Sequence, residues 1–146
     1  SLNYSESDPV AVTTPFGGLF SDPFETPVSQ DGTMWWVGAR YKFNEGRTTV
    51  GLELNRGSQY WCNFAQAPDD IIGPKTATRG DVWEVYLTHR IAKRFIAKFD
   101  YIDYDYDYSG SGWILGAPKD LSATPTLGFP TYDKASKASF SLIARW

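Results

Sequence analysis

Hydrophobic and polar residues alternate along five segments of the chain, and stretches rich in glycine and proline separate these segments. Strict alternation places successive side chains on opposite faces of an extended backbone, so each segment predicts a two-faced β-strand. The segments lie at residues 33–44, 48–55, 80–89, 95–101 and 137–146. The strand at 95–101 runs into the repeat IDYDYDY and can extend beyond its apolar part. We therefore predict an all-β antiparallel meander of about five strands.

The connections between these segments alternate between short and long. The polar, glycine-bearing stretch 44–47 predicts a tight hairpin, and the basic stretch 90–94 predicts a second short turn. Breakers fill residues 1–32, 62–78 and 109–133, which predict long loops. Tight periplasmic turns and long outer loops are typical of outer-membrane β-barrels, and strands of about 10 residues suffice to cross the membrane. The pattern therefore favours part of a transmembrane β-barrel.

The composition agrees with this interpretation and excludes other classes. Aromatic residues make up 16% of the chain, which favours strands. A mean hydropathy of -0.37 and the lack of any apolar run of about 18 residues exclude a transmembrane helix, whereas alternating barrel strands average to such a value. A net charge of -3 argues against a nucleic-acid binder, because no basic stripe is available to neutralise phosphates.

A barrel assigns the two faces of each strand to different surroundings. The polar face would line the lumen, and its residues are Arg40, Lys42, Glu53, Asn55, Glu84, Tyr86, Lys98, Asp100 and Arg145. The lipid-facing residues of the last strand are Ala138, Phe140, Leu142, Ala144 and Trp146. Aromatic girdles would place Phe43 and Trp146 at the inner rim and Trp35, Tyr60, Trp83 and Tyr101 at the outer rim. The mixed charges of the lumen either surround a water-filled pathway or pair across strands and plug a narrow barrel.

The sequence holds few candidates for metal binding or catalysis. Asp103, Asp105 and Asp107 alternate and could offer oxygens to calcium, but the spacing is not that of an EF-hand, which favours an ordinary solvated strand. With only Cys62 and His89, the usual zinc sets are missing, and alternation places His89 on the lipid-facing side near the basic turn. We therefore expect no cofactor and no enzymatic activity.

Two resemblances agree with the barrel. The ending FSLIARW (140–146) resembles the C-terminal assembly signal that Gram-negative outer-membrane proteins present to the barrel-insertion machinery, although Phe is commoner than Trp at its end. The segments NRGSQYW (55–61), TRGDVWEVYLTHRI (78–91) and DYDYSGSGWILGAPKD (105–120) resemble an uncharacterised family of porin-like outer-membrane proteins. The resemblance implies a location in the bacterial outer membrane, with lipid and the barrel-assembly machinery as partners. It implies no substrate.

These inferences converge on a single C-terminal portion of a β-barrel, residues 1–146, with an outer loop at 1–32 and strands and loops at 33–146. About five strands cannot close a barrel, which needs at least about 8, so we expect the remaining strands to come from the same or other chains. The expected function is porin-like passage of small polar solutes or ions. The alternatives are a closed barrel scaffold whose outer loops bind a partner protein or ligand, and a soluble β-barrel or sandwich that acts as a binding module.

Overall fold

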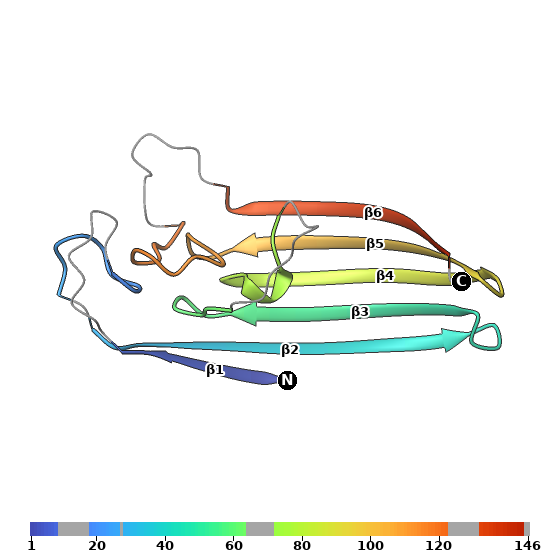
Figure 1. Cartoon of the computed structure of the whole chain (residues 1–146), viewed down its shortest axis with the longest axis horizontal. Coiled ribbons are helices and arrows are strands. Elements are labelled where there is room, and N and C mark those ends of the chain that lie inside the picture. Colours follow the sequence, from blue (N-terminus) through green and yellow to red (C-terminus); the bar gives the residue numbers. More distant parts are fainter. Residues whose placement is uncertain (9–17, 27, 64–71, 123–131, 145–146) are drawn as a thin grey trace.

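Six antiparallel strands form one open sheet in which each strand pairs with its neighbours in the sequence (Figure 1). The computed structural model describes residues 1–8, 18–26, 28–63, 72–122 and 132–144. The elements are β1 (Leu2–Ser7), β2 (Gln30–Phe43), β3 (Thr48–Gly57), the short 3-10 helix η1 (Lys75–Ala77), β4 (Gly80–Ala92), β5 (Phe95–Tyr106) and β6 (Lys134–Ala144). No helix among the described residues is long and apolar enough to cross a membrane. The prediction of an all-β antiparallel meander is confirmed.

The prediction that residues 1–32 form only a loop, and with it the count of about five strands, is wrong. Leu2–Ser7 forms β1, which pairs with the beginning of β2 from Leu2 opposite Trp35 to Ser7 opposite Gln30. The segment LNYSES has little apolar alternation, so its extended form depends on the ladder with β2. A cross-strand hydrogen bond of 2.8 Å from the Tyr4 hydroxyl to Asp31 adds to this pairing.

The other strands are found where alternation predicts them, but most extend further toward the long loops. β2 begins at Gln30, β3 continues to Gly57, and β5 runs through the tyrosine and aspartate repeat to Tyr106. Backbone pairing with the neighbouring strands keeps these ends in the sheet, since Gly80 lies opposite Tyr106 and Met34 lies opposite Gly57. The hydrogen-bonded ladder therefore extends beyond the residues that show apolar alternation.

The alternation of short and long connections is confirmed. The tight turns between β2 and β3 and between β4 and β5 lie at one end of the sheet, and the long connections leave from the other end (Figure 1). In the β2–β3 turn, Asn44, Glu45 and Gly46 all have positive φ, at 53°, 54° and 78°. Asn and Gly adopt this left-handed conformation readily, which suits the right-handed twist of the flanking strands.

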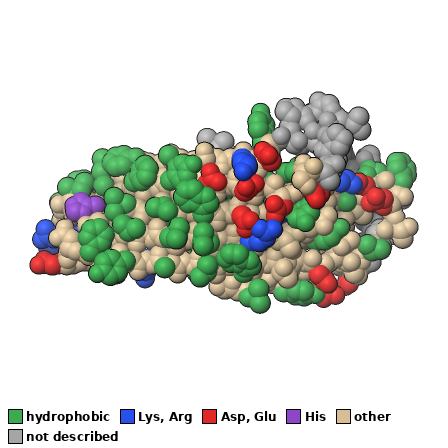
Figure 2. Space-filling model, turned by 180° about the vertical axis from the view of Figure 1, so that it is seen from behind, with side chains coloured by type: hydrophobic (Ala, Val, Ile, Leu, Met, Phe, Trp, Pro, Cys, Tyr) green, Lys and Arg blue, Asp and Glu red, His purple; other side chains and the backbone are tan. Residues whose placement is uncertain are grey.

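The register sorts the side chains into two faces. Residues that lie opposite one another on paired strands form rows across the sheet. One face, which we call the apolar face, contains the rows that begin in β2 at Val37, Ala39, Tyr41 and Phe43. The opposite face, which we call the polar face, contains the rows that begin in β2 at Trp36, Gly38, Arg40 and Lys42. Large side chains on the apolar face are exposed, and Figure 2 shows them gathered over the half of the sheet near the tight turns. The small core of Val82, Ile102 and Tyr104 lies on the polar face. Burial is therefore inverted relative to a soluble sheet.

Candidate functional site

The structure brings the predicted lumen residues together on the polar face. Glu53 lies directly opposite Glu84, and Tyr86 lies opposite Asp100. The same register places Arg40, Lys42, Asn55 and Lys98 on this face. Arg145 lies outside the described residues. The alternation in the sequence therefore predicts the shared face correctly for every predicted lumen residue that the structure describes.

A lysine from a loop occupies the middle of this face. Lys75, the first residue of η1, donates hydrogen bonds to both Glu53 and Glu84. Two carboxylates in directly opposite positions would otherwise repel each other. Burial alone would lower the pKa of Lys75, but the hydrogen bonds to the two carboxylates outweigh it and raise that pKa above its usual value. The ammonium therefore stays charged and offsets part of the negative charge of the polar face.

The segment around Lys75 is fixed to the sheet by further contacts. Asn55 donates its side-chain amide to the carbonyl of Lys75 at 2.9 Å, and the Trp61 indole donates to the carbonyl of Thr76 at 2.7 Å. Gly57 permits the close approach, because a Cβ at this position would lie 2.2 Å from the carbonyl oxygen of Thr78. The end of the β3–β4 connection is thus folded over the polar face. Sequence reasoning missed Lys75, since the breakers around it predict only a loop.

Closer to the tight turns, the polar face carries the exposed cations Arg40 and Lys42 and the half-exposed Lys98. Lys98 pairs with Asp100 at 3.1 Å and lies 6.0 Å from the centroid of the Tyr86 ring. The Tyr86 ring itself covers Gly51. A hollow of about 300 Å³ opens beside it, lined by Trp36, Gly38, Ala39, Arg40, Glu53 and Tyr86. Water and small solutes can reach this part of the face.

One buried arginine, Arg79, joins the long connections at the loop end of the sheet. Its side chain packs over the Phe20 ring, with 5.4 Å from the guanidinium carbon to the ring centroid. It donates to the carbonyl oxygens of Trp61, Ser109, Gly110 and Trp113 at 2.6–3.1 Å. Burial lowers the pKa of Arg79 from its usual value. Residues from the β1–β2, β3–β4 and β5–β6 connections therefore meet at one side chain, and no sequence pattern marks it.

The predicted lipid-facing residues of β6 lie on the apolar face. Ala138, Phe140, Leu142 and Ala144 share it, and Phe140 and Leu142 are 67% and 65% exposed. Trp146 lies outside the described residues. The apolar face therefore continues across β6 to the edge of the sheet.

A row of ion pairs bounds the apolar face on the side of the long loops. Arg56 pairs with Asp81 and with Asp107, and Lys134 pairs with Asp105. The register places Arg56, Asp81, Asp105 and Lys134 in one line across four strands. Figure 2 shows acidic and basic side chains next to the hydrophobic ones on this face. The apolar face thus ends in a charged border.

The aromatic residues predicted for the two rims occupy different places in the structure. Trp83 lies in the row next to the charged border and its ring is 5.2 Å from that of Tyr101, centroid to centroid, whereas Trp35 lies in the border row itself. Phe43 is exposed next to the tight turn. Tyr60 is not on a strand. It lies in the β3–β4 connection and packs edge-to-face on Phe20 with centroids 6.0 Å apart.

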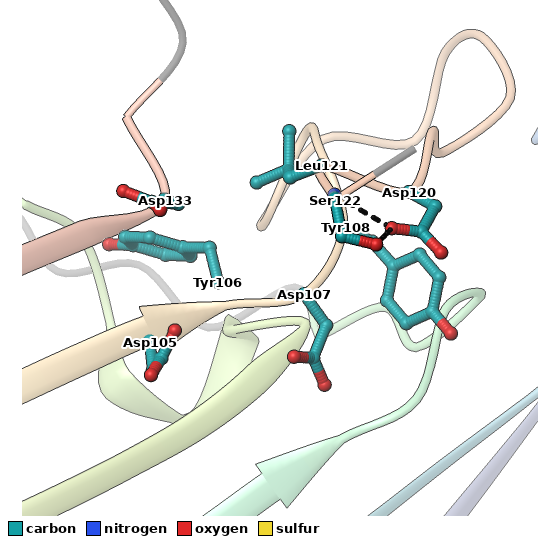
Figure 3. A pocket seen from close by; sticks show the side chains of 8 residues that line it. All are labelled: Asp105, Tyr106, Asp107, Tyr108, Asp120, Leu121, Ser122 and Asp133. Atoms are coloured by element: carbon teal, nitrogen blue, oxygen red, sulfur yellow. Dashed lines mark hydrogen bonds between the residues drawn. The ribbon is translucent and has the colours of Figure 1, made fainter. Parts of the chain in front are cut away.

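The candidate calcium ligands are divided between different contacts. Asp103 lies within hydrogen-bonding distance of the Tyr101 hydroxyl at 3.4 Å, whereas Asp105 and Asp107 pair with cations. A hollow of about 370 Å³ is lined by Asp105, Tyr106, Asp107, Tyr108, Asp120, Leu121, Ser122 and Asp133 (Figure 3). There the Asp120 carboxylate accepts hydrogen bonds from the amide and the hydroxyl of Ser122 at 2.8 and 2.7 Å (Figure 3). In the described part of the chain, no three His, Cys, Asp or Glu side chains are grouped to hold a metal ion.

The histidine and the cysteine lie in different parts of the structure. His89 is on the apolar face near the β4–β5 turn, as predicted, with its Nδ1 2.8 Å from the Thr48 hydroxyl. Cys62 is half-buried in the β3–β4 connection, where burial raises the pKa of its thiol.

Comparisons with known proteins assign the chain to a family. Neither the curated proteins nor the solved structures contain a match. A family model described as "Protein of unknown function (DUF3373)" matches residues 1–146. The match spans every strand of the sheet and all of the connections between them. The chain therefore belongs to the DUF3373 family.

Proposed function

We propose that the chain forms part of the wall of a bacterial outer-membrane β-barrel whose polar face lines a pathway for small polar solutes or ions. The observation that carries this proposal is the inverted burial of the sheet. Charged residues such as Glu84 and Asp100 are buried on one face, while the valines, leucines and aromatics of the other face are exposed. A water-soluble sheet would bury that apolar face against a second layer.

The dimensions of the apolar face support lipid as its neighbour. From Trp83 to Ile91, β4 rises about 26 Å at about 3.3 Å per residue, which matches a tilted strand crossing the hydrocarbon layer. The ion pairs of Arg56 and Lys134 lie beyond this span, at a depth suited to polar lipid headgroups. Soluble monomers rarely expose an apolar patch of more than several hundred Å².

If the sheet lies in lipid, further strands are needed to complete the barrel. β1 and β6 are edge strands within the described structure, and open edges are not stable in lipid because their backbone groups lack partners. Strands from the same or other chains would complete the wall. The machinery that assembles outer-membrane barrels and the surrounding lipid are then the expected partners.

A closed scaffold is the second candidate function. Lys75 and its neighbours fill part of the polar face, so the protein's own loop occupies space that solutes would use. The long connections, tied together at Arg79, would then form an ordered surface that binds a partner. The two functions differ in whether the barrel conducts.

Conductance of the full-length protein in planar bilayers separates these functions. We expect discrete ion currents after insertion, and we expect Lys42→Glu to change the single-channel conductance because Lys42 lies on the polar face. The matched variant Lys134→Glu, at the charged border of the other face, should leave the conductance unchanged. Inserted protein without current would favour the scaffold. Recovery of the protein in the soluble fraction of cells would overturn the barrel.

A further inference from the structure

We propose that Lys75 determines the ion selectivity of this pathway, and that by offsetting part of the negative charge of Glu53 and Glu84 it makes the pathway prefer small anions. This inference rests on the proposed function and names its solute class. Lys75 differs from the other charged residues of the polar face because a loop, not a strand, places it there. The loop thus adds a charge to a wall built by the sheet.

The position of Lys75 is fixed by several independent contacts. Its ammonium donates to both carboxylates, its carbonyl accepts the amide of Asn55, and the next residue, Thr76, is held by the Trp61 indole. The Glu53 side chain is itself held by the Trp36 indole at 3.2 Å. Since both ends of the ion-pair cluster are tethered, the positive charge of Lys75 stays on the wall.

The charge balance of the polar face then favours anions. Its cations in the described residues are Arg40, Lys42, Lys75, Arg90, Lys98 and Lys137. Its carboxylates are Glu53, Glu84 and Asp100. Lys75 is shared by the first two carboxylates, and Lys98 pairs with the third. Arg40 and Lys42 are exposed on the same face, so cationic groups dominate the surface that a solute meets.

Fixed charges on the wall of a narrow pore select ions by the sign of their charge. Rings of Arg and Lys favour anions in pores and rings of Asp and Glu favour cations, because low-dielectric walls focus the field into the water between them. Loss of Lys75 would leave Glu53 and Glu84 opposite each other without a cation between them. The preference should then move toward cations at this point of the polar face.

The test measures the reversal potential of the full-length protein in planar bilayers under a gradient of potassium chloride. The natural protein should reverse toward the chloride equilibrium potential. Lys75→Met should shift the reversal potential toward that of potassium, and Lys75→Arg should retain the anion preference. Glu84→Gln should shift it the opposite way, toward chloride. Lys134→Met makes the same charge change as Lys75→Met on the other face and should produce no shift.

The outcomes distinguish this inference from the function on which it rests. A cation-preferring natural protein, or equal reversal potentials for Lys75→Met and Lys134→Met, would overturn the role of Lys75 while the pathway stands. If Lys75→Met does not fold, Lys75→Gln, which keeps an amide donor toward the two carboxylates but carries no charge, takes its place in the same comparison. Absence of current from every variant, with insertion shown by flotation with vesicles, would overturn the pathway and the selectivity together.

Discussion

At the scale of single residues, glycines on the polar face make room for large side chains that lie flat on the sheet. Gly51 is the clearest case, since a Cβ there would lie 2.2 Å from the Tyr86 ring. Gly51→Ala should therefore cost about 1–3 kcal/mol of unfolding free energy, because the ring must move. Urea unfolding of the refolded protein measures this cost.

A double-mutant cycle identifies the cause. In the background Tyr86→Ala the ring is absent, so adding Gly51→Ala should cost much less than it does in the natural protein. Equal costs in both backgrounds would show that the backbone of β3, rather than the ring, requires glycine.

Arg79 is the residue on which the long loops most depend. Arg79→Met should destabilise the folded loops by about 2–4 kcal/mol, because several carbonyl oxygens lose a charged donor at a buried position. Arg56→Met is the matched control, since its guanidinium forms two ion pairs but is 48% exposed, and such pairs contribute less than about 1 kcal/mol. Limited proteolysis of the β3–β4 and β5–β6 connections measures the difference, and similar cleavage of the two variants would contradict the role of Arg79.

At the scale of elements, alternation predicts strands well where apolar residues recur and poorly where backbone pairing alone sustains a strand. The positions of β2 to β6 follow from the alternation of valines, leucines and aromatics. β1 does not, because one of its faces displays Leu2, Tyr4 and Glu6, which carry no uniform apolar signal. Its existence depends on a partner that lies far along the chain in β2.

The candidate site likewise has a part that alternation predicts and a part that it does not. The shared polar face of Glu53, Glu84 and Asp100 follows from the side-chain period of strands. Lys75 and Arg79 could not be predicted, because loop residues have no period that fixes where their side chains lie. Their roles arise only from tertiary contacts, such as those with Glu53 and with the carbonyl of Trp61.

The apolar face permits a test of lipid contact that depends on depth. Val50, which is 39% exposed, lies in the middle of the apolar face, so Val50→Lys should cost about 2–4 kcal/mol if that face meets hydrocarbon. Ser136→Lys, opposite Asp103 near the charged border, should cost about 0–1 kcal/mol because cations are tolerated at the interface. Urea unfolding from vesicles gives both values. A small, equal effect at the two positions would indicate that water covers this face.

At the scale of the whole molecule, the two ends of the sheet have different chemistry. The tight-turn end has short connections, whereas at the other end long connections that are distant in the sequence are joined by Arg79 and by an ion pair between Asp22 and Lys119. Residues of the β1–β2 and β5–β6 connections therefore meet, although whole strands separate them in the sheet. These contacts join the loops to one another as well as to the strands that they connect.

The Asp22 carboxylate makes that loop structure dependent on pH. Burial opposes its ionisation, but the hydrogen bonds from Lys119 and from the Ala117 amide, the latter 2.9 Å long, outweigh burial and hold the pKa of Asp22 below its usual value. A carboxyl whose pKa is lower in the folded state stabilises that state above its unfolded pKa of about 3.9, and this contribution is lost as the pH falls through the folded pKa. Protection of the Ala117 amide from hydrogen exchange, corrected for intrinsic rates, should therefore be constant near neutral pH and fall in acid.

The variant Asp22→Asn tests this assignment, because it removes the titrating group and retains an oxygen that can accept the Ala117 amide. Its protection should be lower than that of the natural protein at neutral pH, where the Lys119 pair is lost, and should change little in acid. The control is Asp120→Asn. The Asp120 carboxylate accepts a hydrogen bond from Ser122 within the same connection, so this variant should keep the acid dependence of the natural protein. If Asp22→Asn also kept it, another group would have to control the contact between the two loops, and the ion pair would be a consequence of loop packing rather than its cause.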